Sequence, residues 1–271
     1  MAVTHQLAPQ LKQLRLSGIL ETLDIRQQQA VDGQWSYAEF LERLLQDEVE
    51  RRAQKQLDLR VRRAGLNTQK TLDNFDFTFN PAISRQQILQ LAAGDYIRRH
   101  HNLLLCGPSG VGKSHIASAL AHIACQQGFT VLVINAHKML QHLHGGRADN
   151  TYDRRLATYL RPDLLVIDDF GLKPLLPPAP QDLYDVIAER YEQRSILLTS
   201  NRAPTEWVDL FGDPLLAVAG LDRLLHHAEV LTITGASFRA RSRATILTGS
   251  GPVTTEPAAP VMELVGGNND D

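Results

Sequence analysis

The sequence predicts an α/β fold in which helices flank one parallel sheet, preceded by a helical N-terminal segment. From residue 102 onward, apolar runs of strand length alternate with helical patterns, and the runs read NLLLC, FTVLVI, DLLVID, SILLTS and EVLTI. Continuous apolar runs that alternate with helices are typical of parallel strands buried on both faces. The glycine-rich stretch GPSGVGKS lies between the first run and a helical pattern, which fits the same class of fold.

Residues 1–65 predict a helical domain that would bind a partner protein or DNA. Ser36 and Glu39 form a capping box, S-x-x-E, ahead of an apolar pattern with helical spacing. The pattern ends at Gly65, which suits a helix C-terminus. The late part of this helix would either bind DNA or an acidic partner or form a solvated face. Its basic residues are Arg51, Arg52, Lys55, Arg60, Arg62 and Arg63.

Three segments are expected after this helical domain. Residues 66–84 form a linker that contains the aromatic stretch DNFDF. Residues 85–245 form the α/β domain, which begins with a helix at about residues 85–99. Residues 246–271 are rich in Pro and Gly and lack periodicity, so we expect a disordered tail.

Composition limits where the chain works and how it could bind nucleic acid. The 271 residues carry a formal net charge of -2, so any DNA binding must come from local basic patches. The two cysteines, Cys106 and Cys125, form no CxxC pair and indicate a reduced chain without a zinc framework. We find no leader pattern and no apolar stretch of the roughly 18 residues that a membrane span needs. We therefore expect a cytoplasmic protein without membrane contact.

The stretch GPSGVGKS predicts a site for ATP with Mg²⁺. It matches the pattern GxxxxGK[ST], and the strand before it and the helix after it argue against a chance glycine-rich turn. Glycines let backbone N–H groups surround phosphate oxygens, Lys113 supplies a charge for the outer phosphates, and Ser114 can ligate Mg²⁺. The expected nucleotide-binding residues are Gly107, Pro108, Ser109, Gly110, Val111, Gly112, Lys113, Ser114 and His115.

Polar side chains at the ends of two other predicted strands would complete this site. Asp168 ends the run LLVID and can face Mg²⁺ together with Ser114. Asp169 could orient the attacking water or accept its proton, or it could merely cap the following loop. Asn201 follows the run SILLTS and could reach the γ-phosphate or the water, or it could simply begin a turn.

These motifs resemble those of the AAA+ ATPases, and most closely the IstB-like ATPases that help insertion sequences to transpose. The stretches that carry the resemblance are NFDFTFN, NLLLCGPSGVGKSHIASAL, RPDLLVIDDFG, LLTSNRAPTEW and GLDRLLHHAEVLTITGASFR, which together span about residues 70–240. Relatives of that family include DnaC-type helicase loaders and the initiator DnaA. The resemblance implies an AAA+ P-loop core, with the helical N-terminus resembling that of IstB proteins more loosely.

The resemblance also implies roles for single residues. Asn201 looks like the sensor-1 residue, Arg223 is similar in position to the arginine finger, and Arg239 to the sensor-2 arginine. Phe75 and Phe77 lie where the family packs its adenine pocket. Lys113, Asn201 and Arg223 would then act with the acid at position 169 in hydrolysis.

Asp169 and Arg223 decide what kind of ATPase is expected. Most AAA+ members carry Glu at the position of Asp169, so the shorter acid implies slow hydrolysis that a partner or DNA stimulates. An arginine finger supplied by a neighbouring subunit makes a heterologous contact, which builds rings or open helices held together by ATP. The alternative for Arg223 is a surface salt bridge with Asp222 or Glu229, which would contribute little.

A basic cluster between the second and third predicted strands is the candidate DNA contact. Arginine side chains bind phosphates without reading sequence. The alternative is an ordinary solvated helix, because aspartates dilute the positive charge. The candidate DNA-binding residues are Arg147, Arg154, Arg155 and Arg161.

We therefore expect an ATP-dependent DNA-binding regulator that self-assembles on DNA, hydrolyses ATP and assists a transposase. The nearest alternative is a DnaC-like loader of a replicative helicase. A P-loop nucleotide kinase would need a second phosphate-acceptor site, which we do not find, and a nucleotide-gated scaffold with negligible turnover stays open. No histidine spacing matches a metal triad, so Mg²⁺ is the only metal expected.

Overall fold

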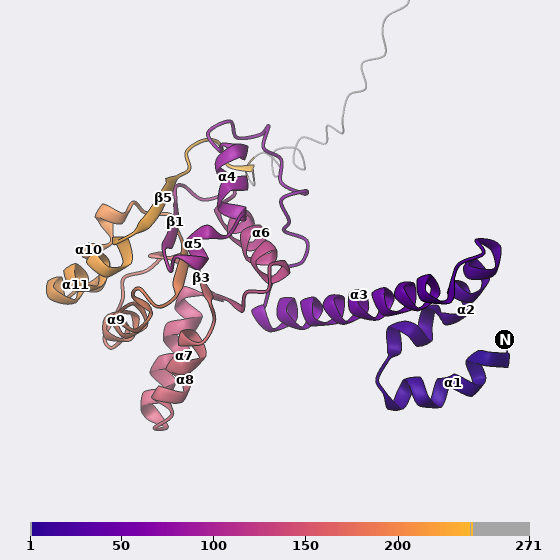
Figure 1. Ribbon diagram of the computed structural model, residues 1–271. Helices are drawn as coiled ribbons and strands as arrows, with labels where there is room; N and C mark the ends of the chain where they lie inside the picture. Colours follow the sequence, from indigo (N-terminus) through magenta and orange to yellow (C-terminus); the bar gives the residue numbers. More distant parts are fainter. Residues whose placement is uncertain (1, 239, 241–271) are drawn as a thin grey trace, which may run out of the picture.

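The computed structural model describes residues 2–238 and residue 240, and its larger part is an α/β domain around one parallel sheet (Figure 1). The strands pair in the order β2-β3-β4-β1-β5 and every pairing is parallel, which confirms the predicted fold class. The strands are β1 (Asn102–Cys106), β2 (Val131–Asn135), β3 (Leu164–Phe170), β4 (Ser195–Ser200) and β5 (Ala228–Thr232).

Helices cover both faces of the sheet, because alternate residues of each buried strand point to opposite sides. Leu103 and Leu105 of β1 pack on one face, whereas Leu104 and Cys106 pack on the other. The first face is covered by α4 (Arg85–Ala92), α5 (Asp95–Arg98) and α6 (Lys113–Gln126). The second face is covered by α7 (Ala136–Ala148), α8 (Tyr152–Leu160), α9 (Ala179–Arg190), α10 (Val208–Phe211) and α11 (Pro214–Leu225). A short 3-10 helix, η1 (Pro204–Glu206), precedes α10.

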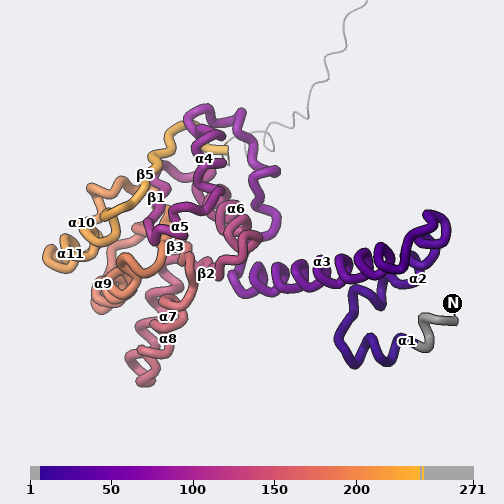
Figure 2. Tube along the Cα trace, viewed as in Figure 1, coloured from indigo at the N-terminus to yellow at the C-terminus, as the bar shows by residue number. Residues whose placement is uncertain are grey.

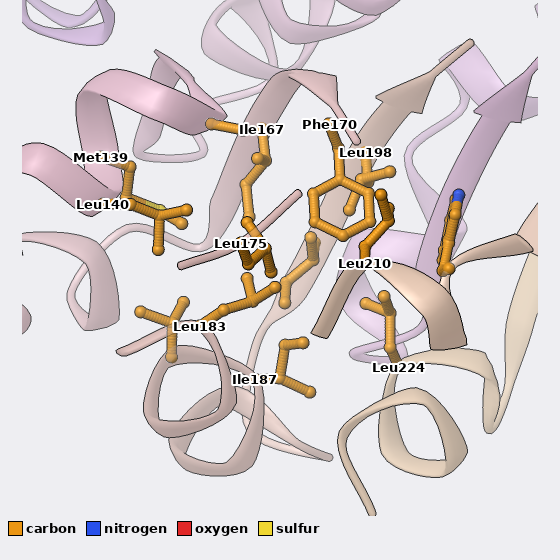
Figure 3. Packing of buried hydrophobic residues seen from close by; sticks show 14 of the residues in the cluster. Met139, Leu140, Ile167, Phe170, Leu175, Leu183, Ile187, Leu198, Leu210 and Leu224 are labelled. Atoms are coloured by element: carbon orange, nitrogen blue, oxygen red, sulfur yellow. The ribbon is translucent and has the colours of Figure 1, made fainter. Parts of the chain in front are cut away.

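The core under the second face fixes the end of β3, where the candidate catalytic acids lie. Phe170 is 1% exposed and packs between β4 and α10, close to Leu198 and Leu210 (Figure 3). Its ring meets the buried Trp207 edge-on at 5.1 Å between centroids. The indole N–H of Trp207 donates to the Ser200 hydroxyl at 3.2 Å, so β3 and β4 end against a fixed aromatic pair.

Two predicted boundaries were wrong for local backbone reasons. The helix expected at about residues 85–99 is split into α4 and α5 at Gly94, whose φ of +79° belongs to the left-handed region. The third strand does not stop at Asp168 but continues to Phe170 through a register shift between Ile167 and Phe170. Such a bulge redirects a side chain, here that of Asp169.

The N-terminal segment is helical as predicted and comprises α1 (Ala2–Gln13), α2 (Ser17–Asp32) and α3 (Tyr37–Ala64). Ser36 and Glu39 form the expected capping box at the start of α3. Gly65 ends the helix with a φ of +70°. The C-terminal end of α3 packs into the α/β domain, where Ala64 is fully buried. The helices α1 and α2 lie toward the N-terminal end of α3 (Figures 1 and 2).

A buried acid of α3, Glu48, holds α2 against α3. Glu48 accepts hydrogen bonds from the backbone N–H groups of Gly18 and Ile19, at 2.6 and 3.4 Å, so it caps the N-terminus of α2 from outside. Burial alone would raise the pKa of Glu48, but hydrogen bonds from Arg52 and from these two amides outweigh burial and lower the pKa. The carboxylate therefore stays ionised at neutral pH and holds both helices.

The packing between α2 and α3 buries few apolar side chains and leaves others exposed. Ile19, Leu23 and Leu44 form the small core. Four apolar side chains spaced four residues apart on α3 lie outside it, and all are at least half exposed; this α3 ridge consists of Tyr37, Leu41, Leu45 and Val49. Side chains at this spacing share one face of a helix, so the ridge is a continuous exposed apolar strip.

The remaining predictions concern the two cysteines, membrane-spanning helices and the C-terminal tail. Cys106 and Cys125 are buried free thiols, and burial raises the pKa of each to about 11, so both are core residues. Within the described residues, no helix is long and apolar enough to cross a membrane. The predicted tail, residues 246–271, lies outside the described part of the chain.

Candidate nucleotide-binding site

The glycine-rich turn joins the carboxyl end of β1 to the first residue of α6. Gly107, Gly110 and Gly112 have φ values of +145°, +86° and +107°, a region that side-chain-bearing residues rarely adopt. A Cβ on Gly107 would lie 1.9 Å from the carbonyl oxygen of Ile233, so only glycine fits there. Because α6 begins at Lys113, its free N–H groups and dipole point toward this turn, which suits an anion.

Lys113 lies at the centre of the turn and is 6% exposed. Its ammonium donates to the carbonyl oxygens of Gly107 and Pro108, at 2.8 and 2.7 Å, and to Oδ1 of Asn201 at 2.7 Å. The structure thus brings Asn201, from the end of β4, into contact with the lysine of the phosphate-binding turn. Both side chains are in position to meet the outer phosphates of a nucleotide.

The structure brings together the Ser114 hydroxyl and the Asp168 carboxylate, the two side chains predicted to hold Mg²⁺. The hydroxyl donates to Oδ1 of Asp168 at 2.8 Å. The Thr199 hydroxyl of β4 donates to the same oxygen and was not predicted. Hydroxyl and carboxylate oxygens are the ligands that Mg²⁺ prefers, so this donor set fits the expected metal.

Asp169 projects from the β3 bulge beside this pair. Its φ is +59°, a left-handed conformation that Asp and Asn adopt more readily than other side chains. Its backbone N–H donates to the Thr199 hydroxyl at 3.0 Å, and Nδ2 of Asn135 donates to its Oδ2 at 3.2 Å. Asn135 also caps α7 through Oδ1, so one amide joins the acid to that helix. The backbone geometry gives a physical reason for Asp rather than Glu at position 169.

A cavity of about 310 Å³ is lined by Asp169, by Asn201 and by the turn from Ser109 to His115, whereas the expected contacts Gly107 and Pro108 do not line it. Phe75 and His115 line it, with their rings edge-on at 5.1 Å between centroids, and the His115 ring donates from Nε2 to the Thr71 carbonyl oxygen at 2.8 Å. Phe77 does not line it; it packs edge-on behind Phe75 at 4.8 Å. The cavity is lined by Lys70, Asn74, Phe75, Asp76, Phe79, Asn80, Ser109, Gly110, Val111, Gly112, Lys113, Ser114, His115, Asp169, Asn201 and Phe238.

Six lining residues were not predicted from the sequence, namely Lys70, Asn74, Asp76, Phe79, Asn80 and Phe238. Phe79 and Phe238 meet edge-on at 5.1 Å between centroids, although they are far apart in the chain. Nδ2 of Asn80 donates to the carbonyl oxygen of Thr234 at 2.7 Å, which ties the linker to the segment after β5. The alternating phenylalanines of NFDFTFN could have drawn attention to Phe79, but nothing in the sequence indicated its partner.

A larger and mainly apolar cavity of about 600 Å³ lies on the other side of Asp169. It is bounded by α7 and by the loop at residues 171–178, and it contains none of the glycine-rich turn. The groups that suit phosphate, Lys113 and the free N–H groups at the start of α6, lie at the smaller cavity.

Of the two arginines assigned by resemblance, the structure describes only Arg223, which lies away from the nucleotide cavity. Arg223 is on α11, does not line the nucleotide cavity, and donates to the Ala219 carbonyl oxygen at 3.0 Å with its guanidinium 5.4 Å from the Tyr184 ring centroid. Among the ion pairs of the described residues, none joins Arg223 to Asp222 or Glu229. Arg239 lies outside the described residues.

The four candidate DNA-binding arginines differ in their availability. Arg147 pairs with the fully buried Asp182 at 2.6 Å and stacks on the Tyr152 ring at 4.2 Å, so it joins α7, α8 and α9. Arg155 donates to the carbonyl oxygen of His142 at 2.7 Å and pairs with an aspartate of the α7–α8 turn. Arg154 and Arg161 are exposed. The candidate DNA surface therefore narrows to Arg154 and Arg161.

The sheet order, the glycine-rich turn and the polar strand ends define a P-loop domain of the AAA+ class. The chain belongs to the family of IstB-like ATP binding proteins, whose family model matches residues 9–245.

Relatives and solved structures agree with this assignment. The chain is 38% identical to an insertion-sequence ATP-binding protein of Mycobacterium tuberculosis, over 86% of this chain and 93% of that protein. It is 35% identical to the ATP-binding protein of insertion sequence IS21 of Pseudomonas aeruginosa, over 88% and 90%. Domain III of the Thermotoga maritima replication initiation protein DnaA matches with a TM-score of 0.53 at 20% identity, over 69% and 78% of the two chains. At that identity the likeness establishes the fold.

Proposed function

We propose that this protein is an ATP-hydrolysing, DNA-binding regulator that assembles on DNA with ATP and assists a transposase. One observation carries the proposal: Lys113, Asn201 and Asp169 share a single cavity with the Ser114–Asp168 pair beside it. This is the set of groups that phosphoryl transfer to water needs. The names of the full-length relatives, which are insertion-sequence proteins, support the role in transposition.

Each polar group has one proposed task in hydrolysis. Lys113 and Asn201 bind the γ-phosphate, and Asp169 orients the attacking water and accepts its proton. Ser114 and Asp168 hold Mg²⁺, which when bound neutralises phosphate charge. The contact between Asn135 and Asp169 keeps the acid turned toward α7 until a ligand competes for it. Turnover is therefore expected to be slow without DNA or partner.

Arg223 is proposed to complete the site of a neighbouring subunit. Replacing Arg223 with Ala should leave ATP affinity unchanged but abolish ATP-dependent assembly and lower turnover about 1,000-fold, since the finger stabilises transition-state charge. Nucleotide titration, sedimentation velocity and steady-state ATPase assays measure the three quantities. Arg85→Ala is the control, because Arg85 is an exposed arginine of the α/β domain that does not line the nucleotide cavity. Normal ATP-dependent assembly of Arg223→Ala would refute the assignment.

A mixing experiment tests whether Arg223 acts between subunits. An equimolar mixture of Arg223→Ala and Asp169→Asn chains contains interfaces in which an intact acid meets an intact arginine. Only the Asp169→Asn chains, half of the total, supply the arginine, and about half of the sites that they meet carry an intact acid, so about one quarter of the wild-type turnover should return. If the mixture is no more active than its components, Arg223 does not act in trans.

Arg154 and Arg161 are proposed to contact DNA phosphates. The double substitution to Ala should weaken DNA binding and reduce the magnitude of the log–log salt slope by about 1.8, because each lost phosphate contact accounts for about 0.9. Fluorescence anisotropy with duplex DNA at several salt concentrations measures both effects. The Arg85→Ala variant should keep the wild-type slope. An unchanged slope in the double variant would place the DNA elsewhere.

The α3 ridge is the proposed docking surface for the transposase. Replacing Leu41, Leu45 and Val49 with Ser should abolish binding of purified transposase without changing ATP affinity, because an exposed apolar strip of this kind favours a protein partner. Leu89→Ser is the matched control, since Leu89 is equally exposed on α4. A replicative helicase is tested in parallel. Binding of the helicase alone would support the loader alternative.

Cytoplasmic localisation is part of the proposal. Two free thiols and a site for ATP suit a reducing compartment that contains nucleotide and DNA.

A further inference from the structure

The edge of the sheet opposite the nucleotide site gathers a cluster of histidines. In a parallel sheet, residues that precede neighbouring strands meet at the amino edge. Asn102 of β1 pairs in register with Ala228 of β5, so His101 and His227, one residue earlier in each case, are neighbours. Their rings are stacked at 5.1 Å between centroids with an interplanar angle of 11°.

Glu192 and His226 complete the cluster. Glu192 lies in the turn between α9 and β4, and His226 is the C-cap of α11. One donor atom each of Glu192, His226 and His227 lie within 4.8 Å of one another. The pair Nδ1 of His226 and Oε1 of Glu192 is already at 3.8 Å. Ligands of a tetrahedral metal ion about 2.0–2.1 Å from each donor are roughly 3.4 Å apart, so the three donors must move closer together to hold an ion, and Nδ1 of His226 must exchange its 2.6 Å contact with the Tyr191 hydroxyl for the ion.

The backbone that presents these groups is fixed. Arg190, which is 1% exposed, donates to the carbonyl oxygens of Tyr159 and Ser195 at 2.7 and 2.6 Å. This anchors the end of α9 just before Glu192. Glu192 and His227 both have a φ of +55°, and such left-handed residues are common at functional sites because surrounding structure must hold them. The side chains are exposed, so an ion could reach them.

We propose that Glu192, His226 and His227 form a site for a divalent transition-metal ion, specifically Zn²⁺. Two imidazoles and one carboxylate are a donor set that Zn²⁺ favours and that Mg²⁺, which prefers oxygen ligands, does not. His101 stacks on His227 and positions its ring. The bound ion joins the turn after α9 to the end of α11, three residues beyond Arg223. The site is separate from the nucleotide cavity and does not depend on the proposed ATPase function.

The test is calorimetric titration of Zn²⁺ into the untagged full chain without nucleotide and with millimolar Mg²⁺ present. We expect about one high-affinity Zn²⁺ per chain. The variant His226→Ala/His227→Asn should bind at least about tenfold more weakly, and Glu192→Gln should also bind more weakly. Asn is chosen at position 227 because it tolerates the left-handed backbone. Co²⁺ should give visible absorption bands with the wild type that the double variant lacks.

The matched control is His137→Ala/His144→Ala, which removes two exposed histidines of α7. It should keep the wild-type Zn²⁺ affinity, and thermal unfolding should show that all variants are folded. The proposal is overturned if the wild type binds no Zn²⁺, or if the His226→Ala/His227→Asn variant keeps its affinity and stoichiometry. The proposal is likewise overturned if only the control variant loses Zn²⁺ affinity, because that result would place the ion on α7.

Discussion

Replacing Asp169 with Asn should lower the DNA-stimulated ATPase rate by about 100-fold or more while ATP binding and ATP-dependent assembly persist. The substitution removes the proposed general base, whose contribution to catalysis is typically of that size. Asn has nearly the same shape as Asp and tolerates the φ of +59° at this position. Steady-state ATPase assays, nucleotide titration and sedimentation of the same preparation measure the three quantities.

The companion variant Asp169→Glu separates chemistry from geometry. Glu keeps the carboxylate but adds one methylene and is less well suited to a left-handed backbone, at a cost of about 1 kcal/mol or more. We therefore expect a less stable protein with reduced rather than abolished turnover. Full ATPase activity in Asp169→Asn would instead reduce Asp169 to a cap for the following loop, as the sequence had left open.

Replacing Lys113 with Ala should weaken ATP binding by about 10- to 100-fold, the equivalent of losing a charged hydrogen bond to phosphate. The ammonium stands within hydrogen-bond distance of two turn carbonyls and of Asn201, so it lies where the outer phosphates must bind. Equilibrium titration with a fluorescent ATP analogue measures the affinity. ATP-dependent assembly should disappear at the same nucleotide concentration.

Two comparisons make the Lys113 result specific. Lys138→Ala removes an exposed lysine from α7 and should leave ATP affinity unchanged. Binding of duplex DNA in the absence of nucleotide should be similar in both variants, which excludes general misfolding. An Lys113→Ala chain that binds ATP as the wild type does would show that the nucleotide occupies another cavity, for example the apolar one beyond Asp169.

Local patterns predicted much of the fold and of the site. The strands were found because they are buried on both faces and therefore consist of apolar runs. Ser36, Glu39 and Gly65 were found because helix ends need specific residues. Lys113 and Ser114 belong to one short motif in the right context. These signals each depend on residues that are close in sequence.

The features that were missed depend on long-range contacts. Asn135 was not singled out, since only the β2–β3 pairing places it beside Asp169. Phe238 reaches the cavity because the chain after β5 folds back over the glycine-rich turn, where its N–H donates to the Gly110 carbonyl oxygen at 3.0 Å. Arg147 was predicted to contact DNA, because its partner Asp182 lies 35 residues away and the sequence does not reveal their ion pair. No local pattern carries this information.

The long helix α3 can convert a small rotation at its C-terminal end into a large displacement at its N-terminal end. Its 28 residues span about 42 Å, and its C-terminal end is embedded through Ala64 in the packing around α6, the helix that starts at Lys113. A tilt of about 10° at that base would move the far end of the helix by roughly 7 Å. A small shift of α6 beside the phosphates would thus become a movement of several ångströms at the α3 ridge, which carries Leu41 and Leu45.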